Sequence, residues 1–413
     1  MKRRRMRRAG MFFSSEFVND WQREASTLER EWDVIVVGGG PAGATAGLCL
    51  ARARHRVVVL ERYRYPRDKA CGDALIPDAI AALRKCALAE RVASNAFRAS
   101  TLQIHGPARA VVEIEGRFWT LPRERLDTLI AQGAMEAGAV IARAKVIDIV
   151  PSDSEVFVRL ESGETLRSRF VLLATGADVA LADRLGLVSR TLPSAVALRG
   201  YVRSSHRIES LLISYDRSIL PGYGWIFPVG EGLYNVGCGV VVGTTSPNPR
   251  GLFERFVGSF PPASELVRRG ELVSALRGAR LRCGLDGFTP PPHSRVLSIG
   301  ETIGTTFPAS GEGIGKAMET AALAAEFVSE SLRRGDDDAL ARFASRVESE
   351  LRPKYLAYRI AESWLARPWL CDFFLSRAAQ SSYLRGALAG ILEERVDPRG
   401  AFSLSGLLRS YVD

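Results

Sequence analysis

Short apolar runs separated by glycine-rich turns dominate the hydrophobic pattern of this chain. The runs at 34–37 and 57–60 predict two buried strands, and the alanine-rich stretch between them predicts the helix of a β–α–β unit. Residues 34–51 contain no charged side chain, but five glycines and a proline interrupt them, so we reject a membrane-spanning helix. Residues 77–94 and a segment opening at 121–127 predict further helices.

Alternating apolar and polar positions predict antiparallel strands further along. Residues 102–118 alternate like paired strands, and residues 144–173 read as a three-stranded meander. The stretch 188–283 is rich in strand and turn signals, which predicts an antiparallel sheet. A last buried strand at 295–299 precedes a long amphipathic helix that opens at Ile314.

These elements predict an α/β fold with a discontinuous Rossmann-like domain, an inserted antiparallel-sheet domain and a C-terminal helical segment. The first domain is expected at 33–76, 120–187 and 292–333, and the sheet domain at 77–119 and 188–291. Residues 334–413 are expected to form helices rich in aromatic residues, and residues 1–32 a basic, flexible extension.

The turn after the first strand, 38–43, has the spacing of a dinucleotide-binding turn. Gly38 permits a tight turn, Gly40 lets the backbone approach a pyrophosphate, and Gly43 lets the following helix pack close to the strand. Glu61 ends the second strand, where an acid binds ribose hydroxyls. The alternative is a glycine-rich turn in an ordinary α/β domain.

Composition adds one feature to this picture. The chain has 413 residues, 46% hydrophobic and 25% charged, and a net charge of +10, of which six positive charges lie within residues 2–8. Without these six charges the rest of the chain has a net charge of +4 and is only mildly basic. The basic start is expected to be a solvated tail, with contact to an anionic membrane or to nucleic acid as alternatives. Nothing further along predicts nucleic-acid recognition.

Metal-binding patterns are absent from the sequence. Its six cysteines contain no CxxC pair, and its four histidines have no ligand spacing, so we expect no metal site. The cysteines are most simply reduced thiols of a cytoplasmic protein.

Several motifs in fixed order carry a family resemblance. They are the turn 38–43 with residues 61–62, the loop 69–73, the segment 122–127, the aromatic strand 223–228 and the segment 300–313. This combination, over about residues 33–395, resembles the geranylgeranyl reductase family of FAD-dependent oxidoreductases, flavoproteins shaped like para-hydroxybenzoate hydroxylase.

The resemblance implies that FAD lies extended across the first domain. Its pyrophosphate would rest on the turn 38–43, with Glu61 on the adenosine ribose and Arg62 beside the adenine. The loop 308–313 would bring a helix N-terminus toward the flavin ring, where its positive end stabilises reduced flavin. The complete predicted cofactor-binding set is Gly38, Gly40, Pro41, Ala42, Gly43, Glu61, Arg62, Cys71, Gly72, Arg123, Ala174, Gly176, Gly300, Glu301, Pro308, Gly311, Gly313 and Ile314.

One position departs from the family pattern. Relatives usually have aspartate where this chain has Glu301, and that aspartate binds the ribityl chain; the longer acid either keeps this hydrogen bond or weakens FAD binding. For Arg123, the alternative to a contact with the cofactor is an ion pair with an acidic residue on the surface.

The predicted catalytic residues are Cys71, Tyr223 and Trp225, expected to face one cavity at the flavin ring. The alternatives are a small buried thiol for Cys71 and plain sheet core for the two aromatic residues.

The resemblance implies a reductase of carbon–carbon double bonds in an isoprenoid or another long apolar substrate. No second dinucleotide-binding unit is found in the sequence, so NAD(P)H or a reduced electron-transfer partner is expected to visit transiently. A monooxygenase or halogenase of the same fold is the first alternative, although the WxWxIP motif of halogenases is missing. A non-catalytic flavin-fold binding protein is the second. The basic start and the aromatic residues at 355–375 suggest peripheral membrane contact.

Overall fold

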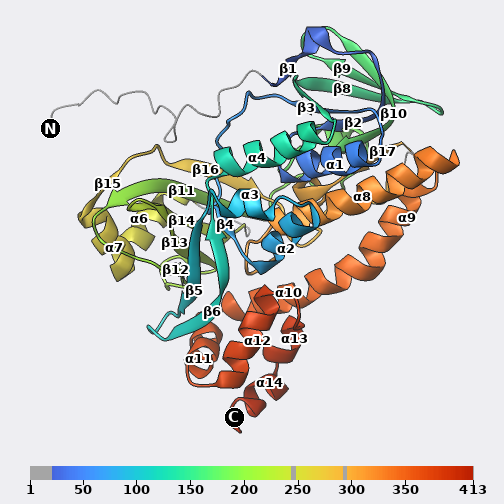
Figure 1. Cartoon of the computed structure of the whole chain (residues 1–413). Coiled ribbons are helices and arrows are strands. Elements are labelled where there is room, and N and C mark those ends of the chain that lie inside the picture. Colours follow the sequence, from blue (N-terminus) through green and yellow to red (C-terminus); the bar gives the residue numbers. More distant parts are fainter. Residues whose placement is uncertain (1–20, 243–247, 292–294, 413) are drawn as a thin grey trace.

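The computed structural model describes residues 21–242, 248–291 and 295–412, arranged as two sheets with helices between and below them (Figure 1). In the first sheet the strands follow the order β1-β7-β3-β2-β10-β9-β8, and β17 also pairs with β10. Its strands are β1 (Arg23–Glu24), β2 (Glu31–Val37), β3 (Val57–Glu61), β7 (Val140–Arg143), β8 (Val146–Pro151), β9 (Val156–Leu160), β10 (Thr165–Leu173) and β17 (Val296–Ser298).

Strand β10 joins the two halves of this sheet. Residues 165–168 pair antiparallel with β9, which completes the predicted meander. Residues 167–173 pair parallel with β2, and residues 171–173 also pair parallel with β17. Leu173 lies opposite both Val37 and Ser298, so three strands end at one edge. Ligands of open α/β sheets bind beyond such carboxyl ends.

Helices α1 (Pro41–Arg52), α4 (Arg123–Glu136) and α8 (Ile314–Arg334) cover one face of the first sheet, with α1 packed against the other two (Figure 1). The predicted helix at 77–94 is two helices, α2 (Pro77–Lys85) and α3 (Ala89–Ala93), because Ala87 adopts a positive φ of 55°. α2 packs on α8 and α3 on α4. Residues 77–94, expected in the sheet domain, thus pack on helices of the first domain, and α2 also contacts β4 and β6 of the second sheet.

The expected flexible extension 1–32 also needs correction. Residues 21–32 belong to the first domain, because β1 pairs with β7 and the side chains of Ala25, Leu28 and Trp32 are buried in its core. Trp21 stacks on Tyr65 at 5.3 Å. The basic run at 2–8 lies outside the described residues.

The second sheet is drawn from two distant parts of the chain. Its order is β15-β11-β14-β13-β12-β5-β6-β4, with β16 also on β11, and β12 joins β5 in parallel. Helices α6 (Pro249–Ser259) and α7 (Pro261–Arg268) pack on one face. Its strands are β4 (Ala74–Leu75), β5 (Phe97–His105), β6 (Val111–Thr120), β11 (Ala195–Ser204), β12 (Leu211–Ser214), β13 (Gly222–Gly230), β14 (Leu233–Val241), β15 (Gly270–Leu272) and β16 (Arg277–Leu281).

The C-terminal part is helical, as predicted, and lies below both sheets in Figure 1. α11 and α12 pack on β6, so this part closes the end of the second sheet. None of the helices described is both long and apolar enough to cross a bilayer. The helices are α9 (Ala339–Arg346), α10 (Arg352–Leu365), α11 (Pro368–Ala378), α12 (Ser382–Leu392), α13 (Pro398–Ala401) and α14 (Leu404–Arg409).

Candidate functional site

A cavity of about 760 Å³ runs from the carboxyl edge of the first sheet, past the second sheet, to the C-terminal helices. Eighteen of the twenty distinct residues predicted for the site line it, including Cys71, Tyr223 and Trp225. The two that do not are Gly43 and Gly300, which pack behind its wall. The structure therefore brings the predicted site residues together.

The glycine-rich turn leaves open space at the N-terminus of α1. A Cβ on Gly43 would lie 1.8 Å from the Gly38 carbonyl oxygen, and one on Gly38 2.3 Å from the Ala174 oxygen, so these glycines serve packing. A Cβ on Gly40 would meet nothing closer than 3.7 Å, the distance to Arg67 Nη2. No side chain caps α1. This cradle fits a phosphate group.

Two guanidinium groups converge on that cradle. Arg123 donates from Nε to Asp127 Oδ1 at 2.6 Å and from Nη2 to Oδ2 at 2.8 Å. Arg67 Nη1 lies 3.1 Å from Asp127 Oδ2, and its Nε lies 3.1 Å from Glu61 Oε2. Arg123 therefore pairs with a buried acid, and the surface-acid alternative is wrong.

Charge holds this cluster ionised. Burial raises the pKa of Asp127, but Arg123 and Arg67 outweigh it and leave the pKa below the usual range. Burial lowers the pKa of Arg123, but the attraction of Asp127 raises it by more than burial lowers it. The pKa of Arg123 therefore lies above its usual value. The two guanidinium groups are balanced by two buried carboxylates, Asp127 and Glu61, so the positive N-terminal end of α1 is what favours an anion in the cradle.

Glu61 and Arg62 lie on the wall of the same cavity, and the side chain of each is paired with other groups of the protein. Glu61 Oε2 accepts from the Gly39 N–H at 2.9 Å and Oε1 from the Tyr63 N–H at 3.1 Å, so the carboxylate stabilises the turn. Arg62 is exposed and pairs with Asp178 at 3.2 Å. Their contacts with ribose and adenine stay predictions.

Glu301 meets a partner that the sequence did not reveal. Lys69 Nζ donates to Glu301 Oε2 at 2.9 Å, and Gly176 lies beside the pair. The ion pair joins the loop after β3 to the turn η3 (Gly300–Ile303) across the cavity.

We expect Glu301→Ala to weaken FAD binding by about 1 to 3 kcal/mol, because a charged hydrogen bond is lost, whereas Glu301→Asp keeps FAD. Lys69→Met is the matched control, since it breaks the ion pair but leaves the carboxylate. Fluorescence titration of apoprotein with FAD measures all three. Equal affinity in Glu301→Ala and wild type would show that this carboxylate does not touch the cofactor.

A hydrogen-bond chain links the Cys71 loop to the aromatic strand. Trp225 Nε1 donates to Asn235 Oδ1 at 2.9 Å, and Asn235 Nδ2 donates to the Cys71 oxygen at 2.8 Å and to Asp73 Oδ2 at 2.7 Å. Tyr223 donates to the Ser310 oxygen at 2.8 Å. The second sheet is thus tied to both loops that border the predicted flavin position.

The thiol of Cys71 is protonated in this setting. Burial raises its pKa, and Arg123 offsets only part of that rise. Burial also raises the pKa of Asp73 to about 6, against the opposing effects of Arg199 and of hydrogen bonds from Tyr201 and Asn235. Because nucleophilic cysteines act as thiolates, Cys71 suits packing against a cofactor better than covalent catalysis.

Sequence reasoning missed four site residues: Arg67, Asp73, Asn235 and Asp127. Asp127 stands four positions after Arg123 on a helix, a spacing that predicts an ion pair and could have been used. Arg67, Asp73 and Asn235 lie in a loop and on a distant strand, so only the tertiary fold joins them.

The far part of the cavity is apolar. It is walled by the second sheet, by α10 and α12, and by Phe402 at the end of α13. Its lining includes Leu102, Ile104, Ile114, Leu211, Ile213, Phe227, Ala361, Leu365, Leu388, Ile391, Leu392 and Phe402.

The residues present fit FAD better than a metal. The open cradle at Gly40, the buried Arg123, the largely buried Arg67 and the uncapped helix suit a pyrophosphate, and the continuous cavity suits an extended dinucleotide. Across the described part of the chain, His, Cys, Asp and Glu form no group of three or more that could hold a metal ion.

Comparison with known proteins agrees with this geometry. Residues 31–198 match the FAD binding domain family, and residues 207–276 match the geranylgeranyl reductase catalytic domain. The chain is 33% identical over 319 residues to a menaquinone reductase of Mycolicibacterium smegmatis, covering 72% of this chain and 76% of that protein. It is 28% identical to digeranylgeranylglycerophospholipid reductase 1 of Methanopyrus kandleri, covering 80% and 90%.

Solved structures share the fold. A geranylgeranyl bacteriochlorophyll reductase-like protein of Thermoplasma acidophilum matches with a TM-score of 0.74 and 20% identity, over 93% of this chain and 96% of that one. A flavin-dependent brominase matches with a TM-score of 0.73 and 17% identity, over 92% and 98%. Given the two domain matches and the 33% identity to a curated reductase, the chain belongs to the geranylgeranyl reductase family of FAD-dependent oxidoreductases.

Proposed function

We propose that this oxidoreductase reduces carbon–carbon double bonds of a polyprenyl chain or another long apolar substrate. The observation that carries the proposal is the continuity of one cavity, which is polar and glycine-rich at the first sheet and apolar between the second sheet and the C-terminal helices. A long hydrocarbon chain gains binding free energy in such an apolar channel. The menaquinone and digeranylgeranylglycerophospholipid reductases are named for substrates that carry polyprenyl chains.

Bound FAD supplies hydride for such a reduction. The turn 38–43, Arg67 and Arg123 would hold the pyrophosphate, and Glu301 the ribityl chain. Tyr223 and Trp225 would wall the substrate position, and Cys71 with Gly72 would border the ring. Their shared task is to align the alkene and to exclude water, which needs no acid or base among these three side chains.

The electron donor is proposed to be NAD(P)H or a reduced carrier protein that visits transiently. The sequence contains one dinucleotide-binding turn of this type, at 38–43. Stopped-flow reduction of the flavin by NADH, NADPH and reduced ferredoxin under argon would identify the donor.

Anaerobic reoxidation of the reduced protein tests the activity. Polyprenyl alkenes should oxidise the flavin without oxygen and yield products two mass units heavier per reduced bond. Reoxidation only in air, with an oxygenated or halogenated product, would favour the monooxygenase or halogenase. A colourless protein that cannot be reconstituted with FAD would favour the binding module.

We expect Trp225→Ala to raise the KM for a polyprenyl substrate about tenfold, because about 1.4 kcal/mol of apolar contact is lost. Cys71→Ala should change the rate or the pattern of reduced bonds more than it changes FAD content. Steady-state kinetics and flavin absorbance measure both. Unchanged kinetics in both variants would show that Trp225 and Cys71 do not contact the substrate.

For the location of the protein in the cell, we propose the cytoplasm, with peripheral contact to a membrane. All six cysteines are free thiols, which suits a reducing compartment. Trp369 and Phe373 on α11 and Leu404 and Leu408 on α14 are exposed, as expected for residues at a membrane interface. Flotation with anionic vesicles at low salt tests this contact.

A further inference from the structure

A buried group of charged side chains lies behind the loop 308–313, and we call it the Lys316 cluster. It consists of Asp78, Glu312, Lys316, Glu319, Glu394 and Lys354. Lys316 is only 5% exposed and pairs with both Glu319 and Glu394, while Lys354 Nζ lies 3.8 Å from Glu394 at the rim. Helices α2, α8 and α10 and the turn after α12 thus meet at these six residues.

Asp78 and Glu312 approach the first turn of α8 from two elements. Glu312 Oε1 accepts from the Gly315 N–H at 2.8 Å. Asp78 Oδ2 lies 2.6 Å from the place a Cβ on Gly315 would take, so glycine is required there for the carboxyl to come so close. This oxygen is buried and has no hydrogen-bond partner among the described residues.

The cluster holds more negative than positive charge. Four carboxyls share one buried lysine and one rim lysine, and a buried anion without its own cation is costly. Burial raises the pKa of Glu312 to about 7 and that of Asp78 well above its usual range, against the lowering effect of Lys316. The groups facing Glu312 are Asp78 from α2, Lys316 from α8, Glu394 after α12, Tyr358 from α10 and Tyr223 from β13. Glu319 and Lys354 lie one step further out, against Lys316 and Glu394.

The Lys316 cluster reaches from the cavity to solvent. Glu312 lines the cavity, two residues after Ser310, which accepts the hydrogen bond from Tyr223. On the outer side, the side chain of Glu394 is 18% exposed and that of Lys354 is 51% exposed. Asp78 lies near enough to both Glu312 and Glu394 for their charges to raise its pKa, so carboxyls follow one another from the cavity wall to the rim.

We propose that Glu312 is the acid that donates the proton accompanying hydride transfer, and that Asp78 is a positioning residue that shares and resupplies this proton. The inference rests on the proposed alkene reduction. In that reaction the π bond breaks as hydride reaches one carbon, and the Glu312 O–H bond breaks as its proton forms a C–H bond at the other. Glu312 is left as a carboxylate and recovers a proton from solvent through Asp78 and Glu394.

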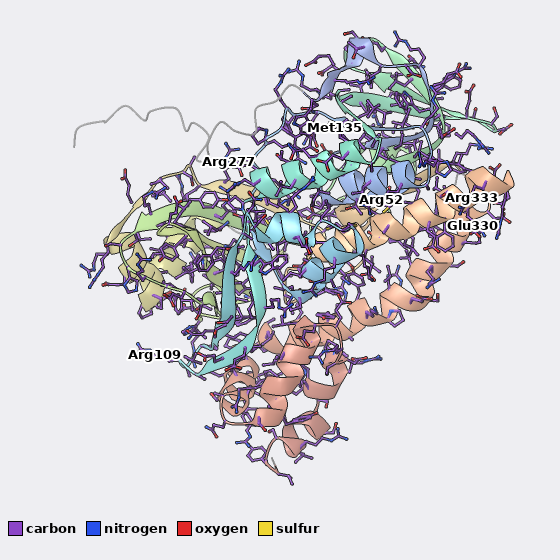
Figure 2. All side chains as sticks on the ribbon, viewed as in Figure 1. Arg52, Arg109, Met135, Arg277, Glu330 and Arg333 are labelled. Carbon is purple, nitrogen blue, oxygen red and sulfur yellow. The ribbon has the colours of Figure 1, made fainter. Side chains whose placement is uncertain are left out.

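Glu312→Gln tests the role with little structural change, because the amide oxygen can still accept from the Gly315 N–H. Glu330→Gln is the matched control: it changes a Glu on α8, the helix that follows Glu312, at its outer end (Figure 2), where Glu330 pairs with Arg334 and Arg342. Anaerobic single turnovers of the FAD-loaded protein, from pH 5.5 to 8.5, give the rates.

The wild-type rate should be highest below pH 7 and fall as pH rises through about 7, since the acid form is the donor. Glu312→Gln should be about 100-fold slower at pH 6 and lose that fall. Asp78→Asn should move the fall to lower pH, because it removes a neighbouring carboxylate. Glu330→Gln should follow the wild type.

Infrared spectroscopy of the apoprotein provides a readout independent of turnover. In the wild type, the C=O band of the protonated Glu312 carboxyl should be lost between pH 6 and pH 8.5, and this part of the signal should be missing at both pH values in Glu312→Gln. Asp78→Asn identifies the band that Asp78 contributes. A wild-type pH profile in Glu312→Gln, or no titrating carboxyl band, would overturn the proposal. If the wild type reduces no polyprenyl alkene, the proposed function itself fails, whereas an active wild type with an equally active Glu312→Gln rejects only this inference.

Discussion

Gly40→Val is expected to give a folded, colourless protein whose affinity for FAD is at least about 100-fold lower, equal to about 2.8 kcal/mol. The protein itself has room for the new side chain, because a Cβ at this position meets nothing nearer than 3.7 Å. That free space is where a pyrophosphate would contact the turn. Only the cofactor is therefore displaced. Flavin absorbance after reconstitution and the far-UV circular dichroism of the apoprotein measure the two effects.

Two other glycines serve as controls for Gly40→Val. Gly258→Ala should leave both fold and FAD unchanged, because no atom lies within 4 Å of its Cβ position. Gly43→Val should prevent folding, since its Cβ would lie 1.8 Å from the Gly38 oxygen. A Gly40→Val protein with a normal FAD content would refute the assignment of this turn to the pyrophosphate.

Asp127→Ala is expected to lower the free energy of unfolding of the apoprotein by about 3 to 5 kcal/mol, because it leaves buried cations without their anion. Asp127 is fully buried between Arg123 and Arg67. Since its folded-state pKa is lowered, its ionised form stabilises the fold above the pKa of the unfolded chain, and this contribution is lost in acid. Urea unfolding at pH 7 and at about pH 2.5, below the usual pKa of an Asp side chain, measures both effects.

An exposed pair provides the comparison for Asp127. Glu136→Ala breaks the ion pair with Arg91 on the surface and should cost less than about 1 kcal/mol. If Asp127→Ala cost no more than Glu136→Ala, the arginines would have found other partners, and the cradle would be less rigid than its contacts indicate.

The elements with strong local patterns could be predicted from the sequence. The β2–α1–β3 unit, the meander β8–β9–β10 and the long helix α8 were expected at these positions, because apolar runs, glycine spacing and helical periodicity are local properties. The break at Ala87 was not predicted, since nothing but its positive φ of 55° separates α2 from α3. The docking of residues 21–32 depends on the pairing of β1 with β7, which a local pattern cannot reveal.

Site residues could be predicted from the sequence where their residue type and spacing are typical of one structural role. Gly38 and Gly40 of the glycine-rich turn, Arg123 and the aromatic strand β13 were expected at the cavity and lie there, whereas Gly43 packs behind its wall. Arg67 and Asn235 were missed because an arginine in a loop and an asparagine on a strand are usually solvated. Their burial follows from contacts with residues up to 164 positions away, as for Asn235 and Cys71.

The order in which strands enter the two sheets has a consequence for synthesis on the ribosome. The second sheet needs both β4–β6 and β11–β16, while the first sheet needs β17 and α8, which emerge last of all these elements. A nascent chain ending near residue 190 therefore leaves the edge of β10 and the α8-facing side of α1 uncovered. Neither sheet is therefore expected to fold alone, and the protein should unfold in one thermal transition. Exchanging either sheet with that of a relative would require joining the two sequences at several points along the chain.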